Sequence, residues 1–188
     1  MGSTYHIRFF AYSALVFFLC SFGTSHSQNR TAELQNSKHF KRLYKVSEDL
    51  YRSEQPSKKG FMELEAMGVK TILNLRRNKD DNKKARHTSL VLKHIRLKSK
   101  EVSERDIIEV LQVLKISDKP ILIHCWHGSD RTGVMTAAYR IIFENWSKTE
   151  AIEEFRLPEF GYHDKWYPNL LQLLNDMDVK AIRTELGL

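Results

Sequence analysis

Cysteine is scarce in this chain, and its scarcity limits the chemistry available. The 188 residues contain two cysteines, Cys20 and Cys125. If residues 1–27 are removed after export, Cys125 remains alone and no intramolecular disulfide can form. A lone thiol in an oxidising compartment is either a buried, inert side chain or a reactive group. The neighbours of Cys125 favour the second interpretation.

An apolar run long enough to span a membrane is also missing from the N-terminal segment. Its apolar stretch, residues 9–22, has 14 residues, whereas a spanning helix needs about 20. Residues 1–27 contain no acidic residue, have Arg8 as their only arginine, and end in the small residues of Ser25-His26-Ser27. This pattern predicts a signal peptide over 1–27 and an exported protein, periplasmic or secreted. The alternative is an uncleaved segment that anchors the chain to a membrane.

Internal repeats, low-complexity tracts and dense basic clusters are absent as well. Without residues 1–27 the chain has 161 residues, with 29 Lys and Arg against 23 Asp and Glu, a net charge of +6. This length corresponds to one domain. The basic residues are dispersed among acids, so the charge suits an anionic substrate and does not indicate nucleic-acid binding. No pattern indicates a dimer interface, and we expect a monomer.

The order of the remaining segments predicts the fold class. Residues 28–42 are polar and are expected to be a tether, which leaves 43–188 as the domain. Short apolar segments predict edge strands within 43–52 and strands within 69–75, 90–97 and 119–124. Helical spacing or capping patterns predict helices over 61–67, from 103 onward, and over 132–146, 147–155, 166–177 and 179–186. We therefore predict an α/β fold with a single central, mostly parallel sheet flanked by helices.

The motif that carries chemistry is HCWHGSDRTG, residues 124–133. It lies where the buried strand 119–124 meets an apolar helix, and a helix N-terminus favours anions. A cysteine in that field is stabilised as the nucleophilic thiolate. Arg131 offers a planar fork to two phosphate oxygens. Five residues between Cys125 and Arg131 allow the loop to encircle one phosphate, with Gly128 relaxing the backbone.

This motif resembles the signature of cysteine-dependent protein tyrosine and dual-specificity phosphatases. Further stretches resemble small bacterial enzymes of the dual-specificity type: LYRSEQPS (50–57), GVKTILNLR (68–76), KPILIHC (119–125), DRTGVMTAAYRII (130–142) and WSKTEAIEEF (146–155). The resemblance covers residues 43–175. It implies a tyrosine phosphatase-like fold, Cys125 as the nucleophile of a phosphocysteine intermediate, and no metal or cofactor.

The resemblance also assigns roles within the loop. Arg131 and the N–H groups of residues 126–131 would form the phosphate cradle, which gives the substrate-binding set Trp126, His127, Gly128, Ser129, Asp130 and Arg131. His124 would orient the loop, and the Thr132 hydroxyl would assist the departing sulfur. For Trp126 the alternative is packing on Tyr162 or Trp166, which we prefer. Arg76 and Arg77 either touch the substrate or pair with Asp80 or Asp81.

The proton donor is the part that the sequence leaves open. The family uses an aspartate from an upstream loop, and residues 99–106 hold Glu101, Glu104 and Asp106 instead. Asp106 completes a capping pattern with Ser103, which gives it a structural role. Asp130, within the signature, resembles a loop residue of some phosphoinositide phosphatases. Glu104 and Asp130 rank level as candidates, followed by Asp106 and then Glu101.

The expected function is hydrolysis of phosphomonoesters, with a phosphorylated protein or a small phosphomonoester as partner. Phosphotyrosine or dual specificity ranks first, because a short chain has little room for pocket-deepening loops and the loop holds no lysine. The alternatives are a phosphoinositide or inositol phosphate phosphatase and a non-catalytic phosphate-binding module. Arsenate reduction needs partner cysteines that the mature chain lacks.

Overall fold

A six-stranded sheet organises the structure, a computed structural model that describes residues 1–2 and 31–188. The strands are β1 Glu33–Leu34, β2 Tyr44–Lys45, β3 Leu50–Ser53, β4 Thr71–Asn74, β5 Val91–His94 and β6 Ile121–His124. Their order is β1-β2-β3-β6-β4-β5. Strands β3, β6, β4 and β5 are parallel to one another, and β2 is antiparallel to both of its neighbours, β1 and β3. The prediction of a mostly parallel central sheet is confirmed.

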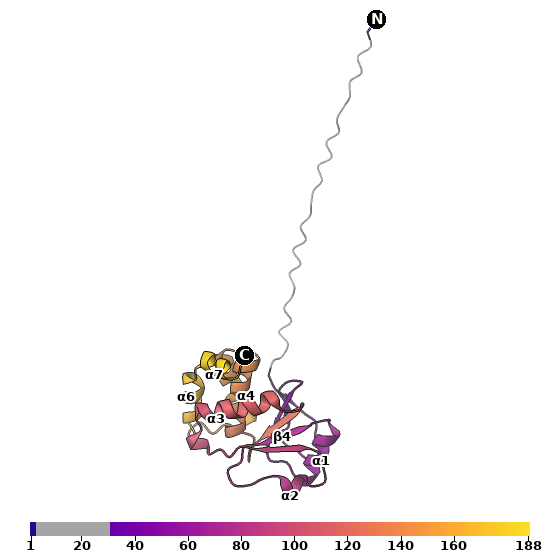
Figure 1. Ribbon diagram of the computed structural model, residues 1–188, viewed down its shortest axis with the longest axis vertical. Helices are drawn as coiled ribbons and strands as arrows, with labels where there is room; N and C mark the ends of the chain where they lie inside the picture. Colours follow the sequence, from indigo (N-terminus) through magenta and orange to yellow (C-terminus); the bar gives the residue numbers. More distant parts are fainter. Residues whose placement is uncertain (3–30) are drawn as a thin grey trace. The chain divides into compact units, whose positions relative to one another are not determined.

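Helices cover both faces of this sheet (Figure 1). They are α1 Lys58–Ala66, α2 Asn82–Ala85, α3 Glu104–Ile116, α4 Asp130–Phe143, α5 Lys148–Phe155, α6 Asn169–Asp176 and α7 Val179–Glu185, with 3-10 turns η1 Ser99–Glu101 and η2 Pro158–Phe160. Helices α1 and α2 lie on one face and α3 to α7 on the other. The capping boxes at Ser103 and Ser147 both form and begin α3 and α5.

Strand β6 is central, and all four of its residues are buried. Side chains alternate along a strand. Ile121 and Ile123 therefore join the larger apolar core under α3 to α7, while Leu122 joins the smaller core under α1 and α2. The carboxyl end of β6 lies between those of β3 and β4. This is the edge at which open parallel sheets bind ligands.

The structure corrects the predicted tether and edge strands. Residues 31–42 belong to the compact unit 31–188 and include β1 and the buried Phe40, which packs with apolar residues of α1. The polar composition of this segment gave no sign that Phe40, its one buried residue, belongs to the core. Strands β2 and β3 are paired on both sides, because β1 covers β2 and β6 covers β3.

Some predicted boundaries also shift. Between the strands predicted within 69–75 and 90–97, the segment 76–86 contains α2, for which no helix was predicted, and the buried Asp81. Helix α1 begins at Lys58, three residues earlier than predicted, with Ser57 as its cap. Helix α4 covers 130–143 rather than 132–146.

The predicted signal segment 1–27 and the first tether residues, 28–30, lie outside the described residues apart from Met1 and Gly2. Within the described part of the chain, no helix combines the length and apolar character needed to cross a bilayer.

Candidate active site

The loop from Cys125 to Arg131 joins β6 to α4, at the strand-to-helix position that the sequence predicts. Cys125 is a free thiol with 2% of its surface exposed. Helix α4 begins at Asp130, so the N-terminal end of its dipole lies within the loop and favours an anion there. The Cys125 thiol therefore lies on the loop that leads into the N-terminus of α4.

The carbonyl groups of the loop are held from outside. The Trp126 oxygen accepts from the Gln55 N–H at 3.1 Å, and the Gly128 oxygen accepts from Arg52 Nη2 at 2.8 Å. Arg42 Nη1 donates to the Ser129 hydroxyl at 2.8 Å and more weakly to the His127 carbonyl at 3.4 Å.

The N–H groups of the same loop are left without partners. None of the backbone N–H groups of residues 126–131 has an acceptor within the described residues. Buried polar backbone groups are almost always paired, and successive unpaired N–H groups form a concave anion site. With the carbonyls tied elsewhere, the loop is organised to surround an oxyanion.

Gly128 is required by this arrangement. Its φ of +74° is a conformation that side chains with a Cβ rarely adopt. A Cβ at this position would also lie 2.6 Å from the Ser53 carbonyl carbon and oxygen, at the end of β3. Both the turn and the close approach of two backbones therefore demand glycine.

Arg131 and Thr132 add polar groups that lack partners. Arg131 Nη1 donates to the carbonyls of Leu75 and Leu97, both at 3.3 Å, which fixes the guanidinium to the ends of β4 and β5. Its Nε is buried and has no partner within the described chain, and neither has the buried Thr132 hydroxyl. One edge of the guanidinium is anchored, and the other is available to phosphate oxygens.

His124 is held by a residue that the sequence analysis did not assign to it. Its Nε2 lies 2.8 Å from Asp81 Oδ2, and its Nδ1 lies 3.0 Å from the Cys125 carbonyl oxygen. His124 is fully buried and Asp81 is 3% exposed. Both partners are acceptors, so either ring nitrogen can donate where it carries a hydrogen. The expectation that His124 orients the loop thus acquires a structural basis.

The rim differs from the prediction. Trp126 is 54% exposed and does not pack on Tyr162 or Trp166; the Arg76 guanidinium lies 4.3 Å from the centroid of its ring. Arg76 itself is buried, and burial lowers its pKa while Asp81 raises it. Trp166, named above as a packing partner for Trp126, is itself 71% exposed.

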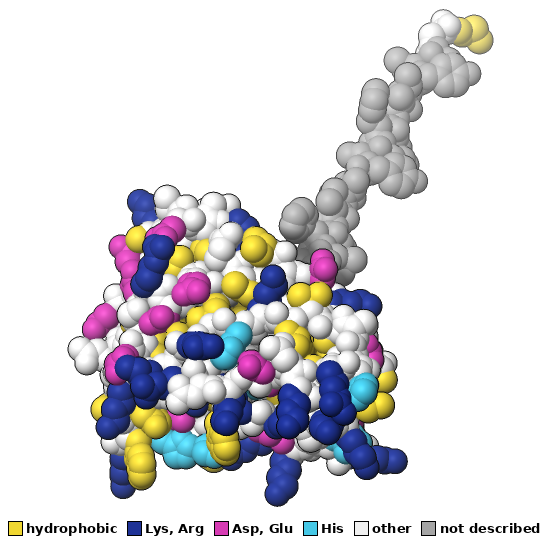
Figure 2. Space-filling view, turned by 60° about the horizontal axis from the view of Figure 1, so that its bottom comes forward, with side chains coloured by type: hydrophobic (Ala, Val, Ile, Leu, Met, Phe, Trp, Pro, Cys, Tyr) yellow, Lys and Arg dark blue, Asp and Glu magenta, His cyan; other side chains and the backbone are white. Residues whose placement is uncertain are grey.

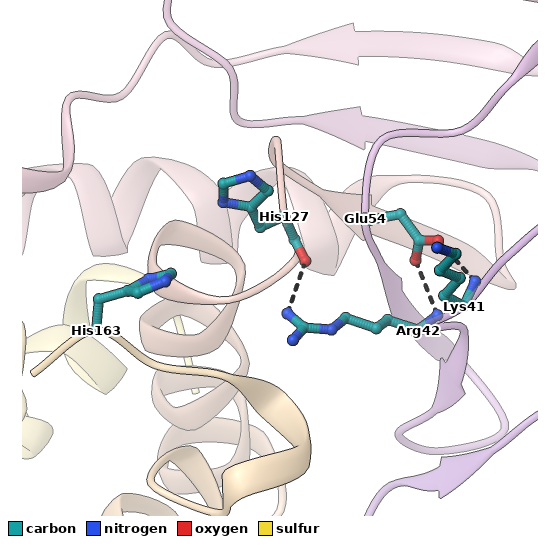
Figure 3. Close-up of a pocket in the computed structure, with 5 residues that line it drawn as sticks. All are labelled: Lys41, Arg42, Glu54, His127 and His163. Atoms are coloured by element: carbon teal, nitrogen blue, oxygen red, sulfur yellow. Dashed lines mark hydrogen bonds between the residues drawn. The ribbon is translucent and has the colours of Figure 1, made fainter.

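A hollow of about 350 Å³ opens beside the loop, lined by Lys41, Arg42, Glu54, His127 and His163 (Figure 3). The Glu54 carboxylate accepts from the backbone N–H groups of Lys41 and Arg42 at 2.7 and 3.0 Å, so it orders this wall. Partial burial and then the charge of His163 lower the pKa of His127. Figure 2 shows a face of the molecule on which Lys and Arg predominate, with histidines among them.

The four candidate proton donors have different surroundings. Glu104 accepts from the Asp178 N–H at 3.0 Å, at the start of α7. Asp106 caps α3 through Ser103, and Glu101 pairs with Lys98. Only Asp130 belongs to the loop region, where it is a buried residue whose carboxylate contacts His163.

Sequence reasoning did not identify four residues that complete the site: Arg42, Arg52, Asp81 and His163. Arg42 lay in the predicted tether, and Asp81 lay between two predicted strands in a segment without a predicted element. Arg52 carried the one available signal, an arginine in a strand that pairs with β6 through buried positions. It is 2% exposed, and burial lowers its pKa to about 10.

A model of the tyrosine phosphatase family matches residues 39–183. The chain belongs to this family. It is 32% identical over 124 residues to the dual specificity protein phosphatase TpbA of Pseudomonas aeruginosa, which covers 65% of this chain and 56% of that protein. The matched segment thus spans just over half of that relative.

Further similarities agree with this membership. The crystal structure of P. aeruginosa TpbA superposes with a TM-score of 0.76 at 26% identity, covering 85% of this chain and 98% of that one. A structure of a TpbA variant in complex with phosphotyrosine gives the same TM-score at 25% identity, covering 86% and 98%. The inositol diphosphatase DSP5 of Arabidopsis thaliana is 28% identical over 153 residues, which are 73% of this chain and 70% of that protein.

Proposed function

We propose that this chain is a cysteine-dependent phosphatase that hydrolyses phosphomonoesters through a phosphocysteine intermediate. The observation that carries the proposal is the loop itself. Six successive N–H groups, the Arg131 Nε and the Thr132 hydroxyl all lack partners in the described residues around one buried free thiol. A phosphoryl group would supply the acceptors that these donors lack. Retention of both Cys125 and Arg131 argues against a non-catalytic binding module.

The steps follow from the positions of these groups. The Cys125 thiolate attacks phosphorus, the S–P bond forms, and the P–O bond to the leaving group breaks. The N–H groups and Arg131 hold the equatorial oxygens as charge shifts in the transition state. Water then attacks the phosphocysteine, the S–P bond breaks, and the Thr132 hydroxyl donates to the departing sulfur. No step requires a metal ion.

For the substrate we propose phosphotyrosine or dual-specificity protein substrates. The exposed Trp126 and the open hollow beside the loop give a shallow entrance, which suits phosphorylated side chains of different lengths. Similarity to TpbA, named a dual specificity phosphatase and solved with phosphotyrosine, supports this choice.

A second candidate is a substrate with several phosphates, such as an inositol phosphate or phosphoinositide. The loop itself holds no lysine, but the structure brings Lys41 and Arg42 to the hollow beside it. These cations lie where a second anionic group could bind, and the likeness to the inositol diphosphatase DSP5 points the same way.

The N-terminal segment supports a proposal about location. The composition of residues 1–27 leads us to propose export to the periplasm or medium after cleavage near Ser27, with an uncleaved membrane anchor as the alternative. The mass of the protein purified from cells distinguishes the two. We also propose a monomer without nucleic-acid partners, which size-exclusion chromatography with and without DNA tests.

The experiment for the activity compares the protein with Cys125→Ser and Arg131→Lys on an aryl phosphate, across about pH 4 to 8 and with a metal chelator. We expect wild-type hydrolysis that survives the chelator and is lost in Cys125→Ser. Arg131→Lys keeps the charge but not the planar fork, and we expect it to lose about 100-fold or more in kcat/KM. Chelator-sensitive hydrolysis that Cys125→Ser retains would contradict the proposal. A phosphotyrosine peptide and an inositol phosphate, compared next, rank the two substrate classes.

A further inference from the structure

Asp130 and His163 form a pair beside the phosphate loop. Asp130 Oδ1 accepts from the His163 backbone N–H at 3.0 Å, and His163 Nδ1 lies 3.1 Å from both carboxylate oxygens. Asp130 is the first residue of α4, and His163 lies 33 residues later in the chain, just after η2. A carboxylate only accepts hydrogen bonds, so Nδ1 carries the hydrogen in this contact.

The second ring nitrogen of His163 is free to act elsewhere. Nε2 has no partner among the described residues, and the His163 side chain is 47% exposed, against 12% for that of Asp130. Figure 3 shows the His163 ring extending toward the loop that carries His127. The two imidazole centroids are 6.2 Å apart, and both rings line the hollow beside the loop. His127 is two residues from Cys125.

The four carboxylates that the sequence offered as proton donors are all engaged in structural contacts. Glu104 binds the start of α7, Asp106 caps α3, and Glu101 pairs with Lys98. Asp130 is near the loop, but both of its oxygens contact His163 and its side chain is mostly covered. A group that accepts from two donors of one residue is better arranged to hold that residue than to release a proton.

We propose that His163, oriented by Asp130 through Nδ1, is the proton donor to the leaving oxygen. The inference rests on the proposed phosphatase function. Asp130 holds the ring through Nδ1 beside the hollow, which leaves Nε2 for the substrate, and it stabilises the protonated imidazole, as a carboxylate does for a catalytic histidine in other hydrolases. His163 is then a catalytic residue and Asp130 a positioning residue.

The proton balance closes with these two residues. As the S–P bond forms, the electron pair of the breaking P–O bond passes to the leaving oxygen, which takes the proton from His163 Nε2. The neutral imidazole then removes a proton from the water that attacks phosphocysteine, and Cys125 departs as thiolate. His163 ends protonated, as it began.

Several charged groups surround the His163 ring and act on its charge. Those that line the hollow or contact the ring are Asp130, His127, Lys41, Arg42 and Glu54. Asp164 follows His163 in the chain, and its Oδ2 lies 4.0 Å from Arg156 Nη2. The carboxylates favour the protonated ring, and the cations oppose it. The pH profile therefore reports the balance of this cluster, and a variant at His163 alone must change it.

Leaving-group dependence tests the proposal. Phenyl phosphate has a poor leaving group that needs protonation, whereas 4-nitrophenyl phosphate has a good one that needs little. For His163→Gln we expect kcat/KM to fall at least about 100-fold on phenyl phosphate and less than about tenfold on 4-nitrophenyl phosphate. In His163→Gln, the fall of kcat/KM at alkaline pH that the wild type shows is expected to disappear. Added imidazole is expected to restore part of the phenyl phosphate activity of His163→Ala.

Control variants separate this role from structure. His87 is an exposed histidine that contacts Arg86, and His87→Gln is expected to keep wild-type kinetics. Asp130→Asn keeps an oxygen that can hold Nδ1, so its loss should be smaller than that of His163→Gln. An equal loss on both substrates in His163→Gln would overturn the proposal. So would a loss confined to phenyl phosphate that appears in Asp130→Asn and not in His163→Gln. Failure of the phosphatase function itself would appear differently, as wild-type protein without Cys125-dependent hydrolysis.

Discussion

Replacement of Asp81 by alanine tests how the buried His124 is held. In the native structure the His124 ring meets Asp81 Oδ2 at 2.8 Å, and both side chains are buried, with 0% and 2% of their surface exposed. The change removes this acceptor and leaves one ring nitrogen without a partner in the core. A buried hydrogen bond to a charged group contributes about 1.5–3 kcal/mol, and a buried polar group left without a partner costs about 1–3 kcal/mol. We expect Asp81→Ala to lower the free energy of unfolding by about 2–4 kcal/mol.

Urea denaturation followed by circular dichroism gives this quantity, with the slope of unfolding free energy against denaturant as a check on the compactness of the unfolded state. The matched control is Asp80→Ala. Asp80 is the exposed neighbour whose carboxylate accepts from the Asn82 N–H at 3.1 Å, its one hydrogen bond among the described residues. Its loss should change stability by less than about 0.5 kcal/mol. Asp81→Asn, which retains an oxygen for His124, should lie between the two. Equal stability of Asp81→Ala and Asp80→Ala would refute the reasoning.

Three further predictions follow from other contacts. Gly128→Ala places a Cβ 2.6 Å from the Ser53 backbone at a φ of +74°, so kcat/KM on an aryl phosphate should fall at least about tenfold through distortion of the cradle; wild-type kinetics would contradict this. Arg140→Met removes the two Arg140 donors that contact the buried Glu154 at 2.8 and 3.0 Å and leaves it the Ala32 N–H. It should cost about 3–5 kcal/mol in urea denaturation, a loss that the double variant with Glu154→Gln should reduce. Burial, followed by Asp164 and Asp130, raises the pKa of Tyr162 from 10.0 to about 12. The unfolded chain therefore loses this proton first, and stability should fall as pH rises from about 10 to 12; Tyr162→Phe should show a smaller fall over that range, and an unchanged fall would exclude this cause.

The sequence was informative where one local pattern determined the outcome. The Ser103 and Ser147 capping boxes predicted the starts of α3 and α5, because each box is complete within four residues. The helix predicted from residue 103 onward buries the apolar residues Ile107, Val110, Leu111 and Leu114, which recur at helical spacing. The motif 124–133 predicted the loop between β6 and α4, since strand, loop and helix are contiguous in the chain.

The sequence was less informative where a contact joined distant segments. Asp81 is 43 residues from His124, and Arg42 is 87 residues from Ser129. Neither residue has an unusual neighbourhood in the sequence, so nothing local distinguishes it from a solvated charge. Polar composition also hid the packing of Phe40. His163 emerged only when the loop after η2 was placed against α4.

The most direct measurement of the central claim is to trap the intermediate on Cys125. The protein is mixed with excess 4-nitrophenyl phosphate, quenched within the first turnovers into alkaline denaturant, digested and examined by mass spectrometry. The account predicts phosphate on the peptide that contains Cys125, formed as the nitrophenol burst appears and absent in Cys125→Ser. A nitrophenol burst with phosphate on another residue, or turnover that persists in Cys125→Ser at the wild-type rate, would contradict thiolate catalysis.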